Sequence, residues 1–547
     1  MFRPKMPEFD VGHWRTLPFP QRLTMICRSW ASQGYGTPGF IFVVYGLKLV
    51  LYVSGWWLSC YFSGITDGGI YWWATVDAFV KAIVWTMLFE GLGLGCGSGP
   101  LTGRYMPPVG GFLYFLRLGT TKLPLFPEAP LLGGNQRNAL DVLGYASTLT
   151  LLLACLWIPS VPVPWLGALI VAILVLGVLD TTLFLVFRSE HYLSVLVCLL
   201  FVDQGLMAAK WVWLAIWFWA AVSKLTRHFP YVMCVMVSNA FWTAYIPGLR
   251  RAMYRNIETD LRPSGVAMML AHTGTLLEFG IPLMLLFGPG GTVLWVLLGV
   301  IAVFHLFILV NFPMGVPLEW NLMMIYGACA LFGVHADESI WAVSAPALVC
   351  WLVGFHVLIP IAGSLWPSRI SFLLAMRYYA GNWAYSAWLF SDGAEERLDA
   401  HLVKSSSLIP KQLLRFYEEE TVEVLMSKVT AFRMMHLHGR ALHTLIPEVF
   451  LGNRTVCWYD GELVAGLTLG WNFGDGHLHR RQLLRAIQAQ CDFAPGELRC
   501  VFVESQPWFS GSLGYSIEDA ADGIIRQGRV DVAPLCAAQP WTAQDAN

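Results

Sequence analysis

The sequence has few charged residues. Asp, Glu, Lys and Arg make up 13% of its 547 residues, whereas 56% are hydrophobic and the mean hydropathy is +0.56. A soluble protein carries roughly 25% charged residues, so this composition excludes an ordinary soluble enzyme. The formal net charge is −1, and no Lys/Arg-rich run with interleaved aromatics occurs, so nucleic acid is not expected as a partner. The composition indicates an integral membrane protein.

Two further features are missing. The twelve cysteines are scattered, and none forms a C-x-x-C pair, which argues against a zinc ribbon or a disulfide framework. The first 38 residues are basic and interrupted by prolines, without the apolar core of a cleavable signal peptide. We therefore expect the first membrane span to act as the insertion signal.

Apolar stretches long enough to span a membrane recur about ten times. The predicted spans lie near 40–62, 72–95, 139–158, 163–187, 191–207, 211–227, 265–287, 291–312, 316–334 and 342–366. Lys and Arg concentrate before the first span and in the 96–138 and 228–264 connections, whereas the connections 63–71, 159–162, 288–290 and 335–341 have none. This asymmetry predicts that both termini are cytoplasmic, in a protein of the plasma (inner) membrane. The segment 231–247 is apolar but short, so we expect an interfacial or re-entrant helix there.

The composition changes after residue 366, where acidic residues and histidines become frequent. The predicted organisation is a cytoplasmic N-terminal segment (1–38), a transmembrane domain (39–367) and a soluble α+β domain (368–547). Within the last, we expect a helix over 412–428, a hairpin over 455–469, a helix over 478–489 and a strand over 498–504. The fold class is thus an all-α polytopic transmembrane bundle of about ten helices with a C-terminal cytoplasmic α+β domain.

Lys224 is the most informative single residue. It ends the apolar, aromatic run of residues 211–225, and a charge in or near hydrocarbon is costly and is usually functional. Glu278 lies in mid-span and needs either a proton or a partner, for which Lys224 is a candidate. His191, His272 and His305 complete a set that we expect to share a polar cavity. In the alternative interpretation Lys224 reaches the membrane interface, and the other groups join helices by hydrogen bonds.

The segments 187–200, 217–225, 272–278 and 304–309 carry a resemblance. Together they resemble the membrane domain of the vitamin K-dependent gamma-carboxylases and their bacterial relatives, over about residues 140–335. The resemblance implies that Lys224 is a catalytic base that deprotonates a reduced quinone, with His191 supporting the resulting charge. His191 and Lys224 are closer in sequence here than in the carboxylases, and the C-terminal part does not look like their peptide-handling domain. Gamma-glutamyl carboxylation itself is therefore not expected.

Two other groups of residues are candidates for binding. Arg104 follows glycines at 91, 93, 95, 97 and 99, whose backbone N–H groups could hold a lipid phosphate, although close packing of a helix end explains the glycines equally well. In the C-terminal domain, weak candidates for metal ligands are His436, His438, His477 and His479. Neither an H-E-x-x-H nor an H-x-E motif with cysteine ligands is present, so no metal site is predicted.

These observations favour a membrane protein that binds or modifies a hydrophobic quinone or lipid. Lys224, His191 and Glu278 are the candidate catalytic residues, and His272, His305 and Arg104 are the candidate substrate-binding residues. A membrane oxidoreductase with a lysine base, using a reduced quinone, is one form of this hypothesis. A lipid transporter or flippase, or a membrane assembly factor, is the alternative. Membrane lipids are the expected partners, together with a protein that docks on the C-terminal domain.

Overall fold

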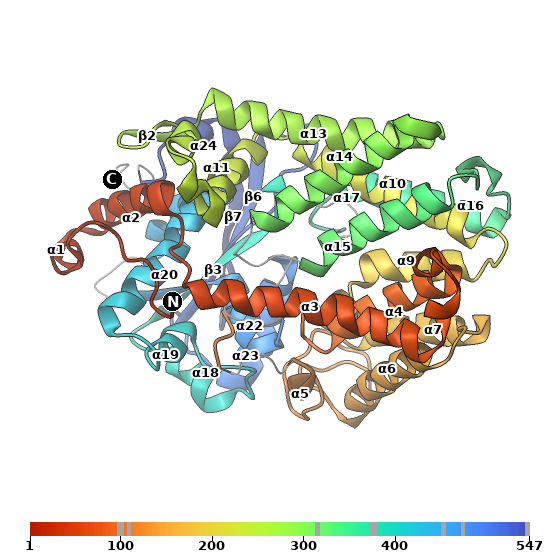
Figure 1. Ribbon diagram of the computed structural model, residues 1–547. Coiled ribbons are helices and arrows are strands. Elements are labelled where there is room, and N and C mark those ends of the chain that lie inside the picture. The colour runs from red at the N-terminus through yellow and green to blue at the C-terminus, as the bar shows by residue number, and fades with distance from the viewer. Residues whose placement is uncertain are drawn as a thin grey trace.

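The computed structural model describes residues 1–95, 103–106, 111–130, 132–311, 318–370, 380–449, 456–471 and 476–541. Long helices run side by side across the molecule, and a β-sheet with its own helices lies at one end of them (Figure 1). Along the direction of the long helices, both termini lie toward the end that carries the sheet (Figure 1). The cavity described below lies where these two parts meet.

Six helices of the described chain are long and apolar enough to cross a membrane. They are α3 (Gly39–Phe62), α6 (Ala139–Trp157), α10 (Gly205–Lys224), α13 (Gly265–Leu286), α14 (Gly291–Val310) and the continuous helix Pro346–Leu365. The last comprises α16 (Pro346–Val353), a π-helical turn (Gly354–Leu358) and α17 (Ile359–Leu365). In α10, 72% of the apolar window is buried, against 11% in α3. Helix α10 is therefore central, and α3 lies at the periphery.

The predicted number of about ten spans is not confirmed. The other four segments form shorter helices: α4 (Val76–Gly91), α7 (Val163–Leu179) with α8 (Thr181–Val186), α9 (Ser189–Leu199), and α15 (Leu318–Gly327) with a π-helical continuation (Ala328–Val334). The 163–187 run is divided at Asp180, whose carboxylate accepts from the backbone N–H groups of Leu123 and Thr182 and pairs with Arg137. Asp180 thus ends one helix and caps the next, which hydropathy alone does not reveal.

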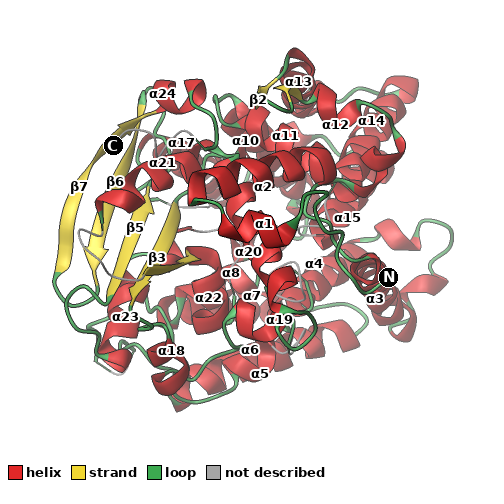
Figure 2. Cartoon of the chain, turned by 90° about the vertical axis from the view of Figure 1, so that its left-hand side faces the viewer, coloured by secondary structure: helices red, strands yellow, loops and turns green. Residues whose placement is uncertain are grey.

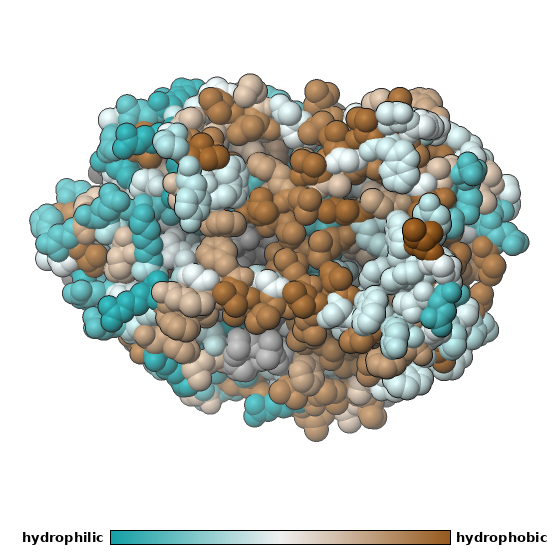
Figure 3. Space-filling view, viewed as in Figure 1, coloured by the Kyte–Doolittle hydropathy of each residue, from teal (hydrophilic) through white to brown (hydrophobic). Residues whose placement is uncertain are grey.

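The outer surface of the helical part is apolar. Hydrophobic residues form a broad zone over the middle of the molecule, across α3, α13 and α14, and hydrophilic residues flank it at both ends (Figure 3). Large apolar side chains of α14 are exposed, among them Trp295 (60%) and Val303 (65%). A surface of this kind suits contact with lipid tails.

The C-terminal part is built on a five-stranded antiparallel sheet in the order β4-β3-β5-β6-β7 (Figure 2). The strands are β3 (Tyr385–Ser391), β4 (Val456–Asp460), β5 (Leu498–Val503), β6 (Ser512–Asp519) and β7 (Gly523–Asp531). Strand β3 is buried throughout because helices cover both faces of the sheet. On one face lie α21 (Leu437–Leu445) and α24 (Val532–Ala537), and on the other α22 (Gly461–Leu469) and α23 (Arg481–Cys491).

The predictions for this part are partly right. The helix over 478–489 and the strand over 498–504 are confirmed as α23 and β5. The helix over 412–428 is divided into α19 (Ile409–Leu413) and α20 (Glu419–Met434). The hairpin over 455–469 is wrong beyond its first strand, because 461–469 is α22. Asp460 accepts from the N–H of Glu462 at the helix start, and Gly470 ends the helix with a φ of 77°.

The N-terminal segment packs on the C-terminal part. Its helices α1 (Val11–Thr16) and α2 (Phe19–Gln33) lie beside α20 (Figure 2). Arg15 and Arg22 both bind the carboxylate of Glu423, at 2.7 and 2.9 Å. Helix α2 also contacts α11 (Phe229–Asn239), the short helix expected near 231–247. A 3₁₀ turn (Phe241–Tyr245), α12 (Leu249–Ala252) and a small hairpin, β1 (Tyr254–Asn256) and β2 (Asp260–Pro263), follow it.

Candidate functional site

A cavity of about 680 Å³ lies between the central helices and the C-terminal part. Helices α10, α11, α13, α14 and α15 form most of its wall, and α2, α20 and the segment before β3 close one end. Nearly all lining side chains are apolar or aromatic. The described lining residues with a titratable side chain are Lys224, Glu278, His305 and His436. The size and the lining are those of a pocket for a hydrophobic ligand.

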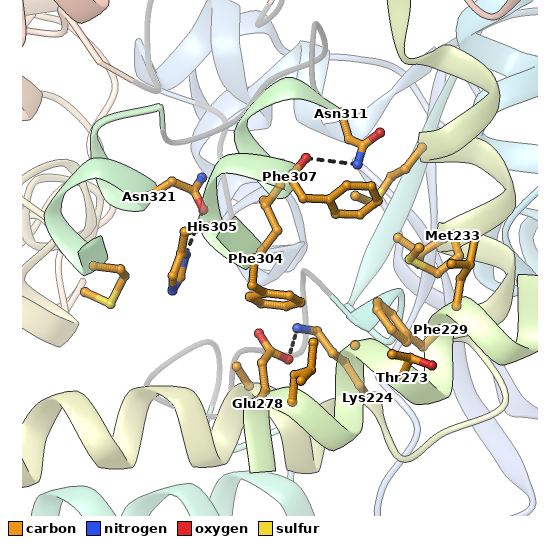
Figure 4. A pocket seen from close by; sticks show the side chains of 18 of the residues that line it. Lys224, Phe229, Met233, Thr273, Glu278, Phe304, His305, Phe307, Asn311 and Asn321 are labelled. Carbon is orange, nitrogen blue, oxygen red and sulfur yellow. Dashed lines mark hydrogen bonds and ion pairs between the residues drawn. The ribbon is translucent and has the colours of Figure 1, made fainter. Parts of the chain in front are cut away.

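Lys224 and Glu278 meet in this cavity. The ammonium of Lys224, the last residue of α10, forms an ion pair with Oε2 of Glu278 on α13 (Figure 4). The aromatic rings of Phe229 and Phe304 lie 5.3 and 5.8 Å from Lys224 Nζ. Both charged residues are buried. Because each charge compensates the other, the pair can exist in an apolar environment where either group alone would be strongly disfavoured.

His305 of α14 also lines the cavity, but its two ring nitrogens already have partners. The indole N–H of Trp217 donates to Nε2 at 2.9 Å, and Nδ1 lies 3.1 Å from Oδ1 of Asn321 (Figure 4). Nε2 therefore carries no proton, and Nδ1–H donates to Asn321. His305 is a neutral residue that fixes α10, α14 and α15 relative to one another.

The cavity reaches the apolar outer surface between α13 and α14. Thr273 on α13 and Val300 and Val303 on α14 line it and are themselves exposed. Gly274 and Gly299 lie on the same wall, and a Cβ atom on Gly299 would meet no atom within 4 Å. Neither glycine has a side chain that could fill this part of the wall. A ligand chain could pass from the lipid-facing zone into the cavity at this position.

The end nearest the C-terminal part is closed by aromatic side chains of Trp30, Trp383 and Phe432 together with His436. His436 Nδ1 lies 2.7 Å from the backbone carbonyl of Phe432 and donates to it. Burial lowers the pKa of His436 to about 3, and the charges of Arg433 and Arg440 add to this effect. The ring is thus neutral, and Nε2 is a hydrogen-bond acceptor that has no partner in the described part of the chain.

The other residues expected at this site lie elsewhere. His191 is buried beside Trp320, with 4.4 Å between the ring centroids, and its Nδ1 lies 3.5 Å from Glu190 Oε1. Trp320 lines the cavity and His191 does not. His272 is exposed on α13, on a different face of the helix from Glu278. The expected common cavity therefore contains Lys224, Glu278 and His305, but neither His191 nor His272.

Arg104 does not line the cavity either. It is buried and donates to the carbonyl of Gly470 at 2.7 Å and to Ser405 Oγ at 3.3 Å, so it links a membrane-side loop to the C-terminal part. Burial lowers its pKa to about 10. Of the glycines expected to form a phosphate cradle with it, those at 97 and 99 lie outside the described residues.

The histidines considered as metal ligands are dispersed. His438 stacks on Trp383, His477 pairs with Glu504 at 2.9 Å, and Nδ1 of His479 lies 2.7 Å from Ser386 Oγ. His436 belongs to the cavity wall. Among the residues that the structure describes, no three His, Cys, Asp or Glu side chains converge as metal ligands.

Comparison with known proteins places the chain in a family. Residues 1–547 match the model of a family described as "Transmembrane protein of unknown function (DUF3556)". The chain belongs to this family. No curated protein and no solved structure matches it. The family description supports integration into a membrane and shows no link to the gamma-carboxylases.

Part of this family member's site could be recognised in the sequence. Trp217 and Lys224 are seven residues apart, two helical turns, so a single face of α10 carries both. The contribution of His436 could not be recognised, because it comes from a domain more than 200 residues further along the chain. Its H-x-H spacing with His438 made both residues weak candidates for metal ligands, whereas the two rings have different environments: only His436 lines the cavity.

Proposed function

We propose that the protein binds a hydrophobic amphiphile, a lipid or a quinone, in the cavity at Lys224 and Glu278. The observation that carries this proposal is an apolar cavity of about 680 Å³ that reaches the lipid-facing surface and contains a buried ion pair. Such a combination suits a ligand with a long apolar chain and one polar group. The exposed residues of α13 and α14 let the chain remain in contact with the membrane.

The ion pair bears on the proposed chemistry. In the resemblance to the carboxylases, Lys224 would deprotonate a reduced quinone. Here the Lys224 ammonium binds Glu278, so the pair would have to separate before the amine could act as a base. His191 lies behind Trp320 and cannot contact a ligand in the cavity without a movement of that ring. The geometry therefore supports binding more directly than it supports an oxidoreductase reaction.

A lipid transporter is the second candidate, because the cavity opens towards lipid. A transporter also requires a path to the other side of the membrane. No lining residue comes from the described connections at the end opposite the sheet, 63–75, 158–162, 200–204, 287–290 and 335–345. The cavity thus favours binding within one half of the membrane over passage through it.

We further propose that the end carrying the sheet faces the cytoplasm. The connections at the opposite end contain no Lys or Arg. Two lysines lie on helices near that end, and both are buried: Lys81 donates to carbonyls of Leu156 and Ile158, and Lys210 to those of His335 and Glu338. They cap helix ends rather than face water, so they do not weaken the asymmetry.

The proposal is tested by mass spectrometry of lipids and quinones extracted from the detergent-purified protein. In Gly299→Phe a large side chain should obstruct the cavity, because Gly299 lines it and has open space at its Cβ position. Gly280→Phe is the matched control, since Gly280 lies on α13 outside the cavity wall and also has no atom within 4 Å of a Cβ.

A single lipid or quinone class should co-purify with the wild type and with Gly280→Phe and be lost from Gly299→Phe. Lys224→Ala should also lose it. The same unselective lipids in all four proteins would overturn the proposal.

A further inference from the structure

We infer that the cavity selects amphiphiles with an electrically neutral, hydroxyl-bearing head over those with an anionic head such as a phosphate. This inference rests on the proposed function and specifies the ligand. Long-chain alcohols, diacylglycerols and prenylated quinols share the required chemistry. Three observations carry it: the charges in the cavity, the free acceptor atoms and the position of the opening.

The charges of the cavity wall cancel. Lys224 and Glu278 are paired, and His305 is neutral because its Nε2 accepts from Trp217. His436 is neutral as well, because its burial disfavours the charged ring. The described lining contains no further titratable side chain. An anionic head would therefore enter an apolar space without a cation of its own, which strongly disfavours it.

The cavity wall offers two acceptor atoms to a donor on the ligand. Glu278 binds Lys224 through Oε2, and Oε1 has no partner among the described residues. His436 offers Nε2 as an acceptor at the closed end of the cavity. A hydroxyl group can donate to either atom, whereas an ether or an ester oxygen cannot. The head is thus expected near Lys224, Glu278 and His436, with the apolar chain extending to the opening between α13 and α14.

The test compares probes with the same chain. Equilibrium binding of radiolabelled hexadecanol, hexadecyl phosphate and hexadecyl methyl ether is measured on the detergent-purified full-length protein. The wild type should bind hexadecanol about tenfold or more tightly than either of the other two. Glu278→Gln leaves Lys224 as an uncompensated cation, so this variant should prefer hexadecyl phosphate. The double variant Lys224→Gln/Glu278→Gln, neutral again, should return to preferring the alcohol.

A second pair of variants tests the acceptor. His436→Phe removes Nε2 and should reduce the preference for the alcohol over the methyl ether, since Glu278 Oε1 remains as an acceptor. His443→Phe is the control, because His443 is buried in the same part of the protein, on α21, but does not line the cavity. Its preference should match that of the wild type.

The outcomes separate the two proposals. If no probe binds the wild type, the proposed function fails and this inference fails with it. If the wild type binds the phosphate as tightly as the alcohol, or if Glu278→Gln leaves their ratio unchanged, only the inference is overturned. If the inference holds, binding of a prenylated quinol and of a diacylglycerol is compared in the same assay to identify the class of the natural ligand.

Discussion

Glu278 reaches from α13 to the ammonium of Lys224 at the end of α10, and this is the ion pair of the described cavity wall. Lys224→Met leaves the carboxylate buried without a cation. Removing one partner of a buried pair typically costs about 3–5 kcal/mol, so the variant should unfold at a clearly lower temperature than the wild type in detergent. The double variant Lys224→Met/Glu278→Leu should recover most of this loss. Equal stability of Lys224→Met and the wild type would show that the pair is not desolvated.

The contact between the N-terminal helices and α20 should weaken in Glu423→Gln. Glu423 binds both Arg15 and Arg22, and all three side chains are about one-third exposed. Partly exposed pairs contribute at most about 1 kcal/mol, and salt screens them. Hydrogen exchange over residues 11–33 should therefore become faster in Glu423→Gln at low salt, and the difference should shrink at high salt.

Glu420→Gln is the matched control for this prediction. Among the described residues Glu420 forms an ion pair with Arg15 alone, at 3.6 Å, and its side chain is 54% exposed. Its exchange should resemble that of the wild type. Equal acceleration in both variants would show that general surface charge, rather than the shared carboxylate of Glu423, holds the segment.

Lys428 should make stability depend on pH. Its ammonium donates to the carbonyl of Gly34 at 3.1 Å, and burial, with the charges of Lys5 and Arg250 in addition, lowers its pKa from 10.5 to about 8. Between these values the unfolded chain binds more protons than the folded protein, so the free energy of unfolding rises with pH. The rise attributable to Lys428 is at most roughly 3 kcal/mol.

The measurement is the unfolding temperature between pH 7 and pH 10 for the wild type, Lys428→Met and Lys428→Arg. Other groups titrate in this range in all three proteins, so the effect of Lys428 is read from the differences between their unfolding temperatures. Lys428→Met should be more stable than the wild type near pH 7, and this advantage should shrink as pH rises. Lys428→Arg keeps its charge and should stay destabilised throughout. Parallel curves for all three would contradict the prediction.

Gly327→Ala should disturb the packing of α15 on α10. A Cβ atom at Gly327 would lie 2.3–2.4 Å from ring atoms of Trp213, which is fully buried. Forcing an extra methyl group into such a contact typically costs about 1–3 kcal/mol. Gly354→Ala is the control, because Gly354 is also helical and a Cβ there would meet no atom within 4 Å. A lowered unfolding temperature in Gly327→Ala alone is the expected result.

Hydropathy predicted the long helices well and the shorter ones poorly. The ranges 40–62, 139–158, 265–287 and 291–312 agree with α3, α6, α13 and α14 to within about two residues, the usual uncertainty of helix ends. Asp180 divides the 163–187 run because its carboxylate caps backbone groups, and a sliding average does not register one polar residue. The segment of α22 looked like a strand because it is buried and apolar at most positions. Its sequence therefore shows neither the spacing of an amphipathic helix nor the alternation of a half-buried strand.

The candidate site was also predicted only in part. A carboxylate in an apolar helix requires a proton or a partner, and that rule gave the Lys224–Glu278 pair as one of two alternatives. Strands β3, β6 and β7 and the contribution of His436 to the cavity were not predicted. They depend on contacts between segments that are distant in the sequence, for which a single sequence provides no signal.

The packing of α2 on α20 has a consequence for biosynthesis. Residues 19–33 leave the ribosome long before residues 419–434 exist, so Trp30 and its apolar neighbours cannot reach their final environment during most of translation. Helix α2 therefore completes its packing only after α20 has been synthesised. A nascent chain truncated before residue 419 should therefore expose this apolar surface, and the complete cavity, whose wall includes both Trp30 and His436, forms only in the finished polypeptide.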